Sequence, residues 1–386
     1  MPLSPPQARV FGAGPTGALA ALALAAAGWQ VAVIDPLTPQ QLCSRSRAYA
    51  LTHSSRTLLD GLGLWQPLRA QLAPFRRLEL CDQAIHRQVS FGVEDLAQWG
   101  ADRSEAAVGW ILQHGPLMEL LLQRLALHPA IQTHLGAPPE AAPRGPVDLV
   151  VAADGRQSPC RRSAGLHWLS WPYRQGCLTV QVRLRGSELD QAWELFRPEG
   201  PFAVLPLGGE AFQLVWSAPL PRLRRLEALE PVAFLEALTA ALPERLQPEL
   251  LLDQPRAFPV GLELAWPLQG RGLVLIGEAA HRCHPVGGQG LNLCWRDVAV
   301  LQRLAAAVAA GRLRPAQLPR RYSWRRWPDL LLVLLATHAL VVLFSNRQPL
   351  LLPLRRLALG LLGRLPALRR LSLATMTDGV GATLHR

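Results

Sequence analysis

The stretch ARVFGAGPTGALAALALAAAGWQVAVID, residues 8–35, decides the fold of the first part of the chain. Residues 8–11 form a short apolar run typical of a buried strand. Residues 16–27 are rich in alanine and leucine and end at Gly28, which predicts a helix with a glycine stop. Residues 31–34 form a second apolar run that leads into an acid. This order of elements predicts a βαβ unit of a parallel sheet.

Gly12, Gly14 and Gly17 form a G-x-G-x-x-G motif between the first strand and the helix. The first glycine permits a tight turn, the second lets the backbone approach a pyrophosphate, and the third lets helix and strand pack closely. The helix N-terminus offers unpaired N–H groups to the phosphates. Asp35, eighteen residues after Gly17, is placed to accept hydrogen bonds from a ribose hydroxyl. We predict a dinucleotide site; the alternative is a tight turn that binds no ligand.

A second stretch, PVDLVVAADGRQSPCRRSAG, spans residues 146–165. Residues 147–152 read as a buried strand that ends at Asp154 and Gly155. A strand ending in Asp-Gly beside a dinucleotide site is a natural ligand-facing edge, because open α/β sheets bind ligands at the carboxyl ends of their strands. The alternative is a polar turn that merely closes a strand.

A third stretch, GLVLIGEAAHRCHPVGGQGLNLCWRDVAVLQRLAAAVAAG, spans residues 272–311. It predicts a parallel strand over 272–276, with Glu278 leaving its end, and a helix over 292–310. The loop between them holds residues that let the backbone come very close to a flat ligand: Pro285, Gly287, Gly288 and Gly290. The helix dipole at the loop favours negative charge, such as that of a reduced flavin. We therefore predict a flavin ring site with Glu278 near the ribityl chain.

The chain has 386 residues and a formal net charge of +12, and its 40 basic residues are all arginine. Arginine usage partly reflects coding bias, so the basic balance does not indicate nucleic acid binding. The arginines are densest from 312 to 370, among apolar runs, which favours contact with an anionic membrane surface. The six cysteines show no CxxC spacing and are expected to be free thiols in a reducing compartment.

The N-terminus lacks the charged leader of a signal peptide, and no run reaches the roughly 18 uninterrupted apolar residues of a spanning helix. Residues 330–344 form an apolar run broken by Thr337 and His338. This run predicts either a packed helix or a helix that lies on the membrane. We expect a cytoplasmic protein that is peripheral on the inner face of the membrane.

The fold class predicted is α/β: a doubly wound FAD/NAD(P)-binding domain with an inserted antiparallel-sheet substrate domain and a helical C-terminal tail. Period-two alternation within 176–259 and a hairpin pattern in 78–92 predict the inserted sheet. Helices are predicted over 54–65 and 111–127. The predicted segments are 1–70, 101–170 and 260–315 for the dinucleotide domain, 71–100 and 171–259 for the substrate domain, and 316–386 for the C-terminal helical region.

GAGPTG at 12–17, ADGRQSPCR at 153–161 and GEAAHRCHPVGGQGLN at 277–292 resemble the three fingerprints of aromatic-ring FAD-dependent monooxygenases. FRPEGPFAVLPL at 196–207 and the tail at 320–346 resemble the ubiquinone-biosynthesis hydroxylase branch in particular. The resemblance implies FAD as cofactor. The resemblance implies that the ADP half of FAD is bound by Gly12, Gly14, Gly17 and Asp35, and that Arg47 also contacts the cofactor. Asp154 and Gly155 belong to a motif that would serve both FAD and the nicotinamide donor, and Glu278 would bind the ribityl chain. The residues implied along the flavin are Pro285, Gly288, Gln289, Gly290, Leu291 and Asn292.

The resemblance implies that NAD(P)H reduces FAD and that O2 adds at flavin C4a to give a hydroperoxide. The ring of a phenol bearing a polyprenyl tail would then attack the distal oxygen. No side chain is predicted to be catalytic, because the cofactor carries the chemistry. Alternatives are a flavin-dependent reductase or halogenase, the latter disfavoured by the absence of lysine, and an FAD-binding accessory protein that works with other quinone-synthesis proteins.

The chain departs from the family pattern at three places. Glu278 replaces the usual aspartate, Cys294 replaces a common glycine, and Gln113 or His114 stands where an arginine is frequent. These departures predict weaker FAD binding. His281, Cys283 and His284 do not predict a metal site, because no second ligand pair is evident. The predicted walls of the substrate pocket are Phe202, Val204, Leu205, Pro206 and Trp216.

Overall fold

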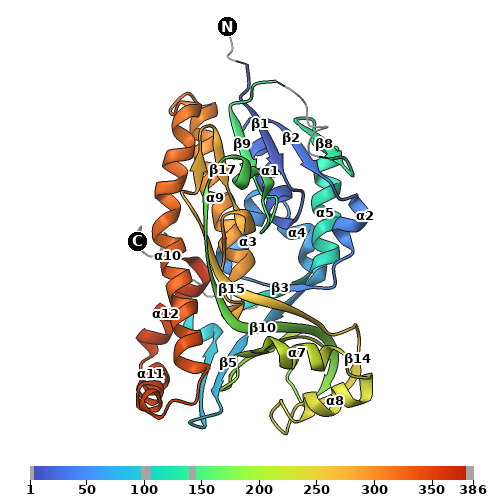
Figure 1. The fold of residues 1–386 in the computed structure, drawn as a ribbon, viewed down its shortest axis with the longest axis vertical. Helices are drawn as coiled ribbons and strands as arrows, with labels where there is room; N and C mark the ends of the chain where they lie inside the picture. Colours follow the sequence, from blue (N-terminus) through green and yellow to red (C-terminus); the bar gives the residue numbers. More distant parts are fainter. Residues whose placement is uncertain (1–3, 97–105, 139–144, 380–386) are drawn as a thin grey trace.

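A mostly parallel sheet forms the part of the molecule drawn uppermost in Figure 1. The computed structural model describes residues 4–96, 106–138 and 145–379. The sheet has the order β16-β17-β9-β1-β2-β8, and every neighbouring pair except β16–β17 is parallel. The α/β class is therefore confirmed. Its strands are β1 (Gln7–Phe11), β2 (Gln30–Asp35), β8 (Ile131–Leu135), β9 (Leu149–Ala152), β16 (Gln269–Gly270) and β17 (Leu273–Leu275).

Helices α1 (Pro15–Ala26), α5 (His114–Leu127) and α9 (Gln289–Ala309) pack against one another beside this sheet. Helix α1 contacts both of the others and is buried from Gly17 to Ala25, because its alanines and leucines are apolar on every face. Helix α5 begins three residues later than the sequence predicts, and α9 begins three residues earlier. The shorter helices here are α2 (Pro39–Cys43), α3 (His53–Gly61), α4 (Trp65–Leu68) and α6 (Pro159–Ser163).

A small antiparallel sheet joins the two halves of the molecule. It has the order β3-β7-β4, formed by Ala48–Leu51, Gly109–Gln113 and Leu72–Phe75. Strand β7 explains the late start of α5, because its central residues pair with both neighbours instead of turning into a helix. The helix predicted over 54–65 is also shorter than expected and ends at Gly61.

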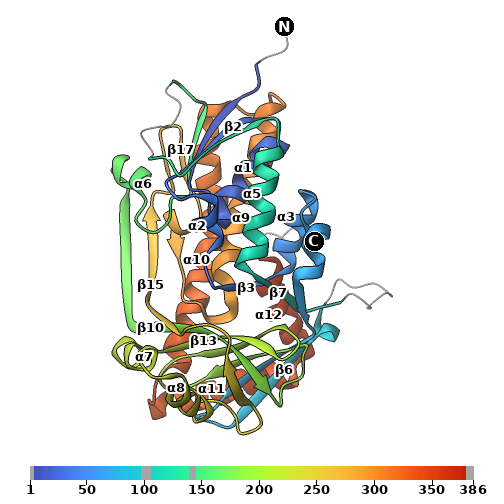
Figure 2. The same cartoon turned by 90° about the vertical axis from the view of Figure 1, so that its right-hand side faces the viewer.

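A large, mostly antiparallel sheet forms the lower part of the molecule. It runs β18-β15-β10-β13-β12-β11-β5-β6, with β14 paired to β10, and only β11–β5 among these pairs is parallel in the described chain. Strands β10 and β15 rise from it to the level of α6 (Figure 2). The predicted hairpin at 78–92 is confirmed, and within 176–259 strands β12 and β13 form a second antiparallel hairpin. The strands are β5 (Arg77–Asp82), β6 (Arg87–Gly92), β10 (His167–Arg185), β11 (Gln191–Phe196), β12 (Phe202–Gly208), β13 (Ala211–Pro219), β14 (Gln247–Leu251), β15 (Arg256–Trp266) and β18 (His281–Arg282).

Segments 71–96 and 171–259 thus contribute to one sheet, although they are far apart in sequence. The domain boundary predicted at 100–101 lies outside the described residues. The division into domains therefore stays a prediction.

Both faces of the large sheet are covered. One face packs against α7 (Leu220–Glu227) and α8 (Pro231–Thr239) through a core that includes Phe202, Trp216 and Phe234. The other face meets the C-terminal helices in a separate apolar cluster. A sheet buried on both sides loses the polar alternation that would mark a solvent face.

Three C-terminal helices run down one side of the molecule (Figure 1). They are α10 (Leu318–Phe344), α11 (Leu352–Arg364) and α12 (Pro366–Asp378). The upper part of α10 packs on α9, and its lower end reaches the large sheet, where Phe344 stacks on Phe196 at 4.2 Å between ring centroids. By length and composition alone, Pro315–Phe344 could cross a membrane, and 39% of its most apolar window is buried. The apolar run at 330–344 is therefore the C-terminal part of α10, a helix of 27 residues.

Candidate active site

One cavity of about 1570 Å³ lies between the parallel sheet and the large sheet. It exceeds the roughly 300–1,000 Å³ of a pocket for one drug-sized ligand, so it has room for a cofactor and a substrate together. Three of the predicted cofactor residues, Gly17, Gln289 and Asn292, lie outside its lining. The predicted residues that do line it are Gly12, Gly14, Asp35, Arg47, Asp154, Gly155, Glu278, Pro285, Gly288, Gly290 and Leu291.

The glycine turn after β1 forms one end of the cavity. Gly12 has φ 98°, and a Cβ there would lie 2.3 Å from the Ala153 carbonyl oxygen. A Cβ on Gly17 would lie 1.9 Å from the Gly12 carbonyl oxygen. A Cβ on Gly14 would meet nothing within 4 Å. Gly12 and Gly17 are therefore required by packing, whereas Gly14 faces open space in which a ligand can approach the backbone.

The N-terminus of α1 borders this end of the cavity. Its N-cap residue, Gly14, supplies no side-chain cap, so the first N–H groups of the helix are available to a phosphate. Asp35, which is buried, accepts hydrogen bonds from the Ala13 N–H at 2.6 Å and the Leu37 N–H at 2.8 Å. Asp35 thus holds the glycine turn in place while it lines the cavity.

Asp154 and Gly155 lie where β9 ends. One carboxylate oxygen of Asp154 accepts from the Cys160 N–H at 3.0 Å, and the other, Oδ1, is buried with no partner among the described residues. Gly155 has φ 80°, and a Cβ there would meet nothing within 4 Å. An unpartnered buried acceptor beside an open glycine fits a donor group of a bound cofactor.

Arg161 ties this strand end to the turn that carries Glu278. Its guanidinium donates to the carbonyls of Ala279 and Arg156, each at 2.7 Å, and stacks 3.8 Å from the Trp168 ring. Because these contacts are internal, Arg161 fixes the cavity wall between the end of β9 and the turn that carries Glu278.

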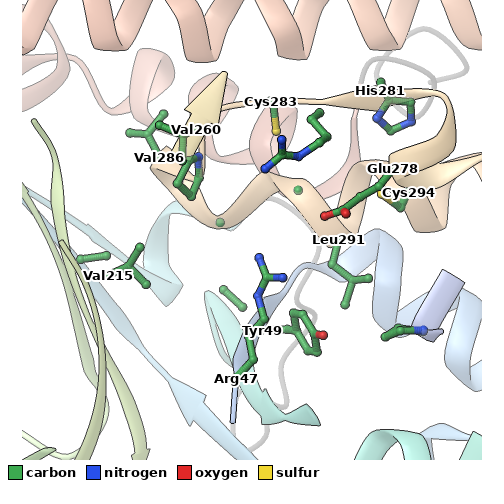
Figure 3. Close-up of a pocket in the computed structure, with 18 of the residues that line it drawn as sticks. Arg47, Tyr49, Val215, Val260, Glu278, His281, Cys283, Val286, Leu291 and Cys294 are labelled. Carbon is green, nitrogen blue, oxygen red and sulfur yellow. The ribbon is translucent and has the colours of Figure 1, made fainter. Parts of the chain in front are cut away.

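Glu278 and Arg47 enter the middle of the cavity from opposite sides (Figure 3). Glu278 leaves a short 3-10 turn, Gly277–Ala279, directly after β17. Arg47 precedes β3, and its guanidinium lies 5.7 Å from the Tyr49 ring. Cys294, beside Glu278 in Figure 3, is buried, and burial raises the pKa of its thiol well above its usual value. The pair Glu278 and Arg47 offers an acceptor and a cation to the polar middle of a dinucleotide.

The glycine loop before α9 crosses the cavity. Gly287 has φ 69° and Gly288 has φ 64°, and a Cβ on Gly288 would lie 3.0 Å from the Ala50 methyl group. Gly290 faces open space. Gly288 is the N-cap of α9 and supplies no side-chain cap, so the positive end of this helix also lies at the cavity.

Gln289 and Asn292 lie one layer behind this loop and outside the cavity lining, and their contact with the flavin stays a prediction. The Asn292 amide donates to the Ala50 and Gly288 carbonyls at 2.7 and 2.9 Å. Gln289 donates to the Gly287 carbonyl at 3.1 Å and accepts from the Arg296 guanidinium at 3.0 Å. Both side chains therefore support the loop from the protein interior.

The position of the missing arginine is taken by His114. Its ring lies 2.6 Å from the Leu42 carbonyl oxygen and 2.8 Å from the Tyr49 hydroxyl, and burial lowers its pKa. Gln113 is exposed. His114 lines the cavity as a hydrogen-bonded neutral group, so it does not replace the charge of an arginine.

The predicted substrate wall is corrected by the structure. Of the five proposed residues only Leu205 lines the cavity; Phe202, Val204, Pro206 and Trp216 do not. Phe202, Val204 and Trp216 pack in the core under α7 and α8, on the opposite face of the sheet. The residues that line the cavity from β12 and β13 are their alternate neighbours, because successive side chains of a strand point to opposite faces. These neighbours are Ala203, Leu205, Gln213 and Val215.

Sequence reasoning missed two parts of the lining. One is the set of apolar residues from the C-terminal helices, which closes the end of the cavity away from the glycine turn. The other is Glu194 on β11, a buried acid in the wall of the large sheet. An acid inside an otherwise apolar strand was the available signal for Glu194. The helical residues include Leu340, Leu343, Leu359, Leu362 and Met376.

The histidines after β17 have internal partners. The His281 ring lies 2.7 Å from an Asp297 carboxylate oxygen, and His284 Nδ1 accepts from the Val286 N–H at 3.2 Å. Within the described ranges, no group of three His, Cys, Asp or Glu side chains is placed to hold a metal ion.

Comparison with known proteins identifies the family. Residues 7–114 and 146–328 match the FAD binding domain family. The chain is 31% identical to the 3-demethoxyubiquinol 3-hydroxylase of Escherichia coli over 96% of this chain and 97% of that protein. It is 33% identical to the ubiquinone hydroxylase UbiL of Rhodospirillum rubrum over 94% of this chain and 87% of that protein. Among solved structures, p-nitrophenol 4-monooxygenase of Pseudomonas putida matches with a TM-score of 0.79 at 19% identity, over 97% of this chain and 99% of that one.

The geometry of the cavity fits the cofactor of this family. Gly14 and Gly155 leave open space, Asp154 keeps an unused acceptor, and two uncapped helix N-termini border the lining. Together with matches that span nearly the whole chain, these features show that the chain belongs to the FAD binding domain family and is an FAD-dependent monooxygenase.

Proposed function

We propose that the protein hydroxylates the ring of a phenol that carries a polyprenyl tail, with FAD as cofactor, O2 as oxidant and NAD(P)H as reductant. The observation that carries this proposal is the continuity of one cavity from the glycine turn, past the loop at Gly287, to an apolar end under the C-terminal helices. An apolar tail would be removed from water there. The relatives named as ubiquinone hydroxylases support the same class of substrate.

In this proposal the glycine turn and Asp35 hold the ADP half of FAD, and Asp154 accepts from a hydroxyl of the cofactor. Glu278 binds the ribityl chain, and Arg47 lies opposite. The loop from Pro285 to Leu291 borders the flavin ring, and the N-terminus of α9 stabilises negative charge on it. Bound FAD supplies the activation of O2 and the transfer of one oxygen atom to the ring. The chain orients the ring and excludes water from it.

The outer surface of the C-terminal helices supports a membrane location for this reaction. Several leucines there are largely exposed, with Leu335 at 63%, Leu357 at 58% and Leu371 at 58%. Arg356, Arg364 and Arg370 lie in the same helices. Exposed leucines beside arginines suit the surface of an anionic bilayer, into which a polyprenyl substrate partitions. We propose that α10 to α12 rest on the cytoplasmic face of the membrane.

The proposal is tested with purified protein, NADPH and a phenol that carries a short isoprenoid tail. The expected result is a bound-flavin spectrum that bleaches anaerobically, and a product that gains one oxygen atom from labelled O2 when air is admitted. Flavin that NADPH fails to reduce would contradict the direct nicotinamide donor. Protein that reduces the phenol or forms only peroxide, with no labelled product, would contradict hydroxylation. Bound flavin without any turnover would favour the accessory role.

The membrane part of the proposal has a separate test. Flotation with vesicles that contain anionic phospholipid should carry the protein upward, and vesicles of neutral phospholipid should carry less of it. Equal recovery with both kinds of vesicle would contradict the role of the arginines, and no flotation with either would contradict membrane contact.

A further inference from the structure

Glu194 is an acid in the apolar wall of the cavity. It lies on β11, where its neighbours across the sheet are Leu80 on β5 and Ala203 on β12. All three residues line the cavity. The side chain of Glu194 accepts one hydrogen bond, from the Gly287 N–H at 3.3 Å. Gly287 belongs to the glycine loop, so the carboxyl group lies where the loop and the substrate wall meet.

The neighbouring acid Glu79 shows what a structural carboxylate in this sheet looks like. Both oxygens of Glu79 accept hydrogen bonds, from Gln88 at 2.7 Å and Gln191 at 3.2 Å, and Glu79 does not line the cavity. Among the described residues Glu194 forms no ion pair, and its second carboxylate oxygen has no hydrogen-bond partner in the protein. A buried carboxyl group that is this poorly satisfied is costly to keep for packing alone.

We propose that Glu194 is a catalytic base that takes the proton of the substrate's phenolic hydroxyl group. This inference rests on the proposed function. As the phenol O–H bond breaks, its proton passes to a carboxylate oxygen of Glu194 and the electron pair stays on the ring oxygen. The ring carbon gains one oxygen atom derived from O2, and NAD(P)H supplies the two electrons that reduce the other atom to water. That carbon then loses its hydrogen as a proton, and Glu194 returns its own proton to the ring oxygen.

The electrostatics of the site agree with this role. Burial raises the pKa of Glu194 to about 7, against a smaller lowering by the Gly287 N–H. A base with a pKa near the working pH transfers protons most effectively. Cys177 on β10 lies close enough to Glu194 for the two groups to interact, and burial raises the pKa of its thiol to about 12, so the thiol stays neutral near pH 7. The positive charges of Arg47 and Arg282 oppose this rise and lower the pKa of Cys177. Leu80 and Ala203 beside Glu194 carry no charge.

The test compares Glu194→Gln with wild type and with Glu79→Gln as the matched control from the same sheet. Product formed per NAD(P)H oxidised is measured with a geranyl-substituted phenol, from about pH 6 to about pH 10, the usual pKa of a phenol. At pH 7 we expect Glu194→Gln to form product roughly 10²-fold more slowly. The deficit should shrink as the pH approaches the pKa of the phenol, because solution then supplies the phenolate. Wild type and Glu79→Gln should lose activity as the pH falls through about 7.

Two results would overturn the inference. Glu194→Gln with wild-type rates would exclude a base at this position. A deficit that is constant over the whole pH range would show that Glu194 only holds the loop through Gly287. Failure of the proposed function is a distinct result, since wild type itself would then hydroxylate no phenol. In that case the absorbance of the bound phenol is compared at a pH above 7, where Glu194 is ionised. A red shift present in wild type and absent in Glu194→Gln would show the hydrogen bond from the phenolic hydroxyl group to Glu194 without turnover, and no shift in wild type would contradict the inference.

Discussion

Replacing Asn292 with alanine should destabilise the protein itself, before any effect on contact with FAD. The amide is fully buried and accepts hydrogen bonds from the Thr52 N–H at 3.0 Å and the Ser55 hydroxyl at 2.6 Å. It donates to the carbonyls of Ala50 and Gly288 at 2.7 and 2.9 Å. Hydroxyl groups can turn to other partners, and the Gly288 carbonyl, as the N-cap of α9, keeps the first hydrogen bond of the helix. The loss therefore falls on two backbone groups, the Thr52 N–H and the Ala50 carbonyl. At about 1–3 kcal/mol for each unsatisfied group, the free energy of unfolding should fall by about 2–5 kcal/mol.

The assay separates a scaffold residue from a cofactor ligand. Thermal unfolding is measured on FAD-free protein, and FAD affinity is then measured by titration. Asn292→Ala should lower the melting temperature of the FAD-free protein. Gly14→Ala is the matched contrast, because its new methyl group meets no atom within 4 Å and lies in the cavity. Gly14→Ala should therefore melt like wild type without FAD but bind FAD more weakly. If FAD-free Asn292→Ala also melted like wild type and lost only FAD affinity, Asn292 would be a direct ligand and this reasoning would be refuted.

Three further changes test the site and its support. Arg326→Met breaks buried ion pairs with Asp297 at 2.6 Å and Asp329 at 2.7 Å. Urea unfolding should show that the free energy of unfolding falls by about 3–5 kcal/mol. A fall below about 1 kcal/mol would contradict the stabilising role of these ion pairs. Although burial acts to raise them, the charges around Asp297 and Asp329 lower the pKa of both carboxyl groups. The two carboxylates therefore stabilise the folded protein above their unfolded pKa of about 4, and this stabilisation is lost as the pH falls through the lowered folded pKa values. Acid titration followed by circular dichroism should show this loss in wild type and a smaller loss in Arg326→Met. Glu278→Asp introduces the aspartate that the sequence resemblance leads us to expect at this position, so FAD titration should give tighter binding. Weaker binding would mean that the cavity suits the longer side chain.

The glycine turn after β1 could be predicted from sequence because short-range steric contacts determine which residues fit there. Gly12 and Gly17 are fixed by contacts of the turn with itself and with the adjacent strand end. Such contacts follow whenever a strand, a tight turn and a helix occur at this spacing. The supporting roles of Gln289 and Asn292 could not be predicted in the same way. Their partners lie on β3, on α3 and about two turns further along α9, and nothing in the glycine motif specifies which side chains turn inward.

The face of the large sheet that meets the substrate could not be assigned from alternation, because both faces are buried. Apolar residues such as Phe202 and Leu205 look equivalent in the sequence, yet they pack on opposite sides. In a strand buried on both sides, an acid that lacks protein partners marks the face that meets a ligand, whereas a buried acid on the other face, such as Glu79, needs amide groups to satisfy both of its oxygens. Glu194 is that mark on β11, and it pairs across the sheet with Ala203. The pairing places Ala203 and Leu205 on the cavity face and Phe202 on the other. The missing information was thus the register between β11 and β12, which arises from contacts between strands and is not encoded in either strand alone.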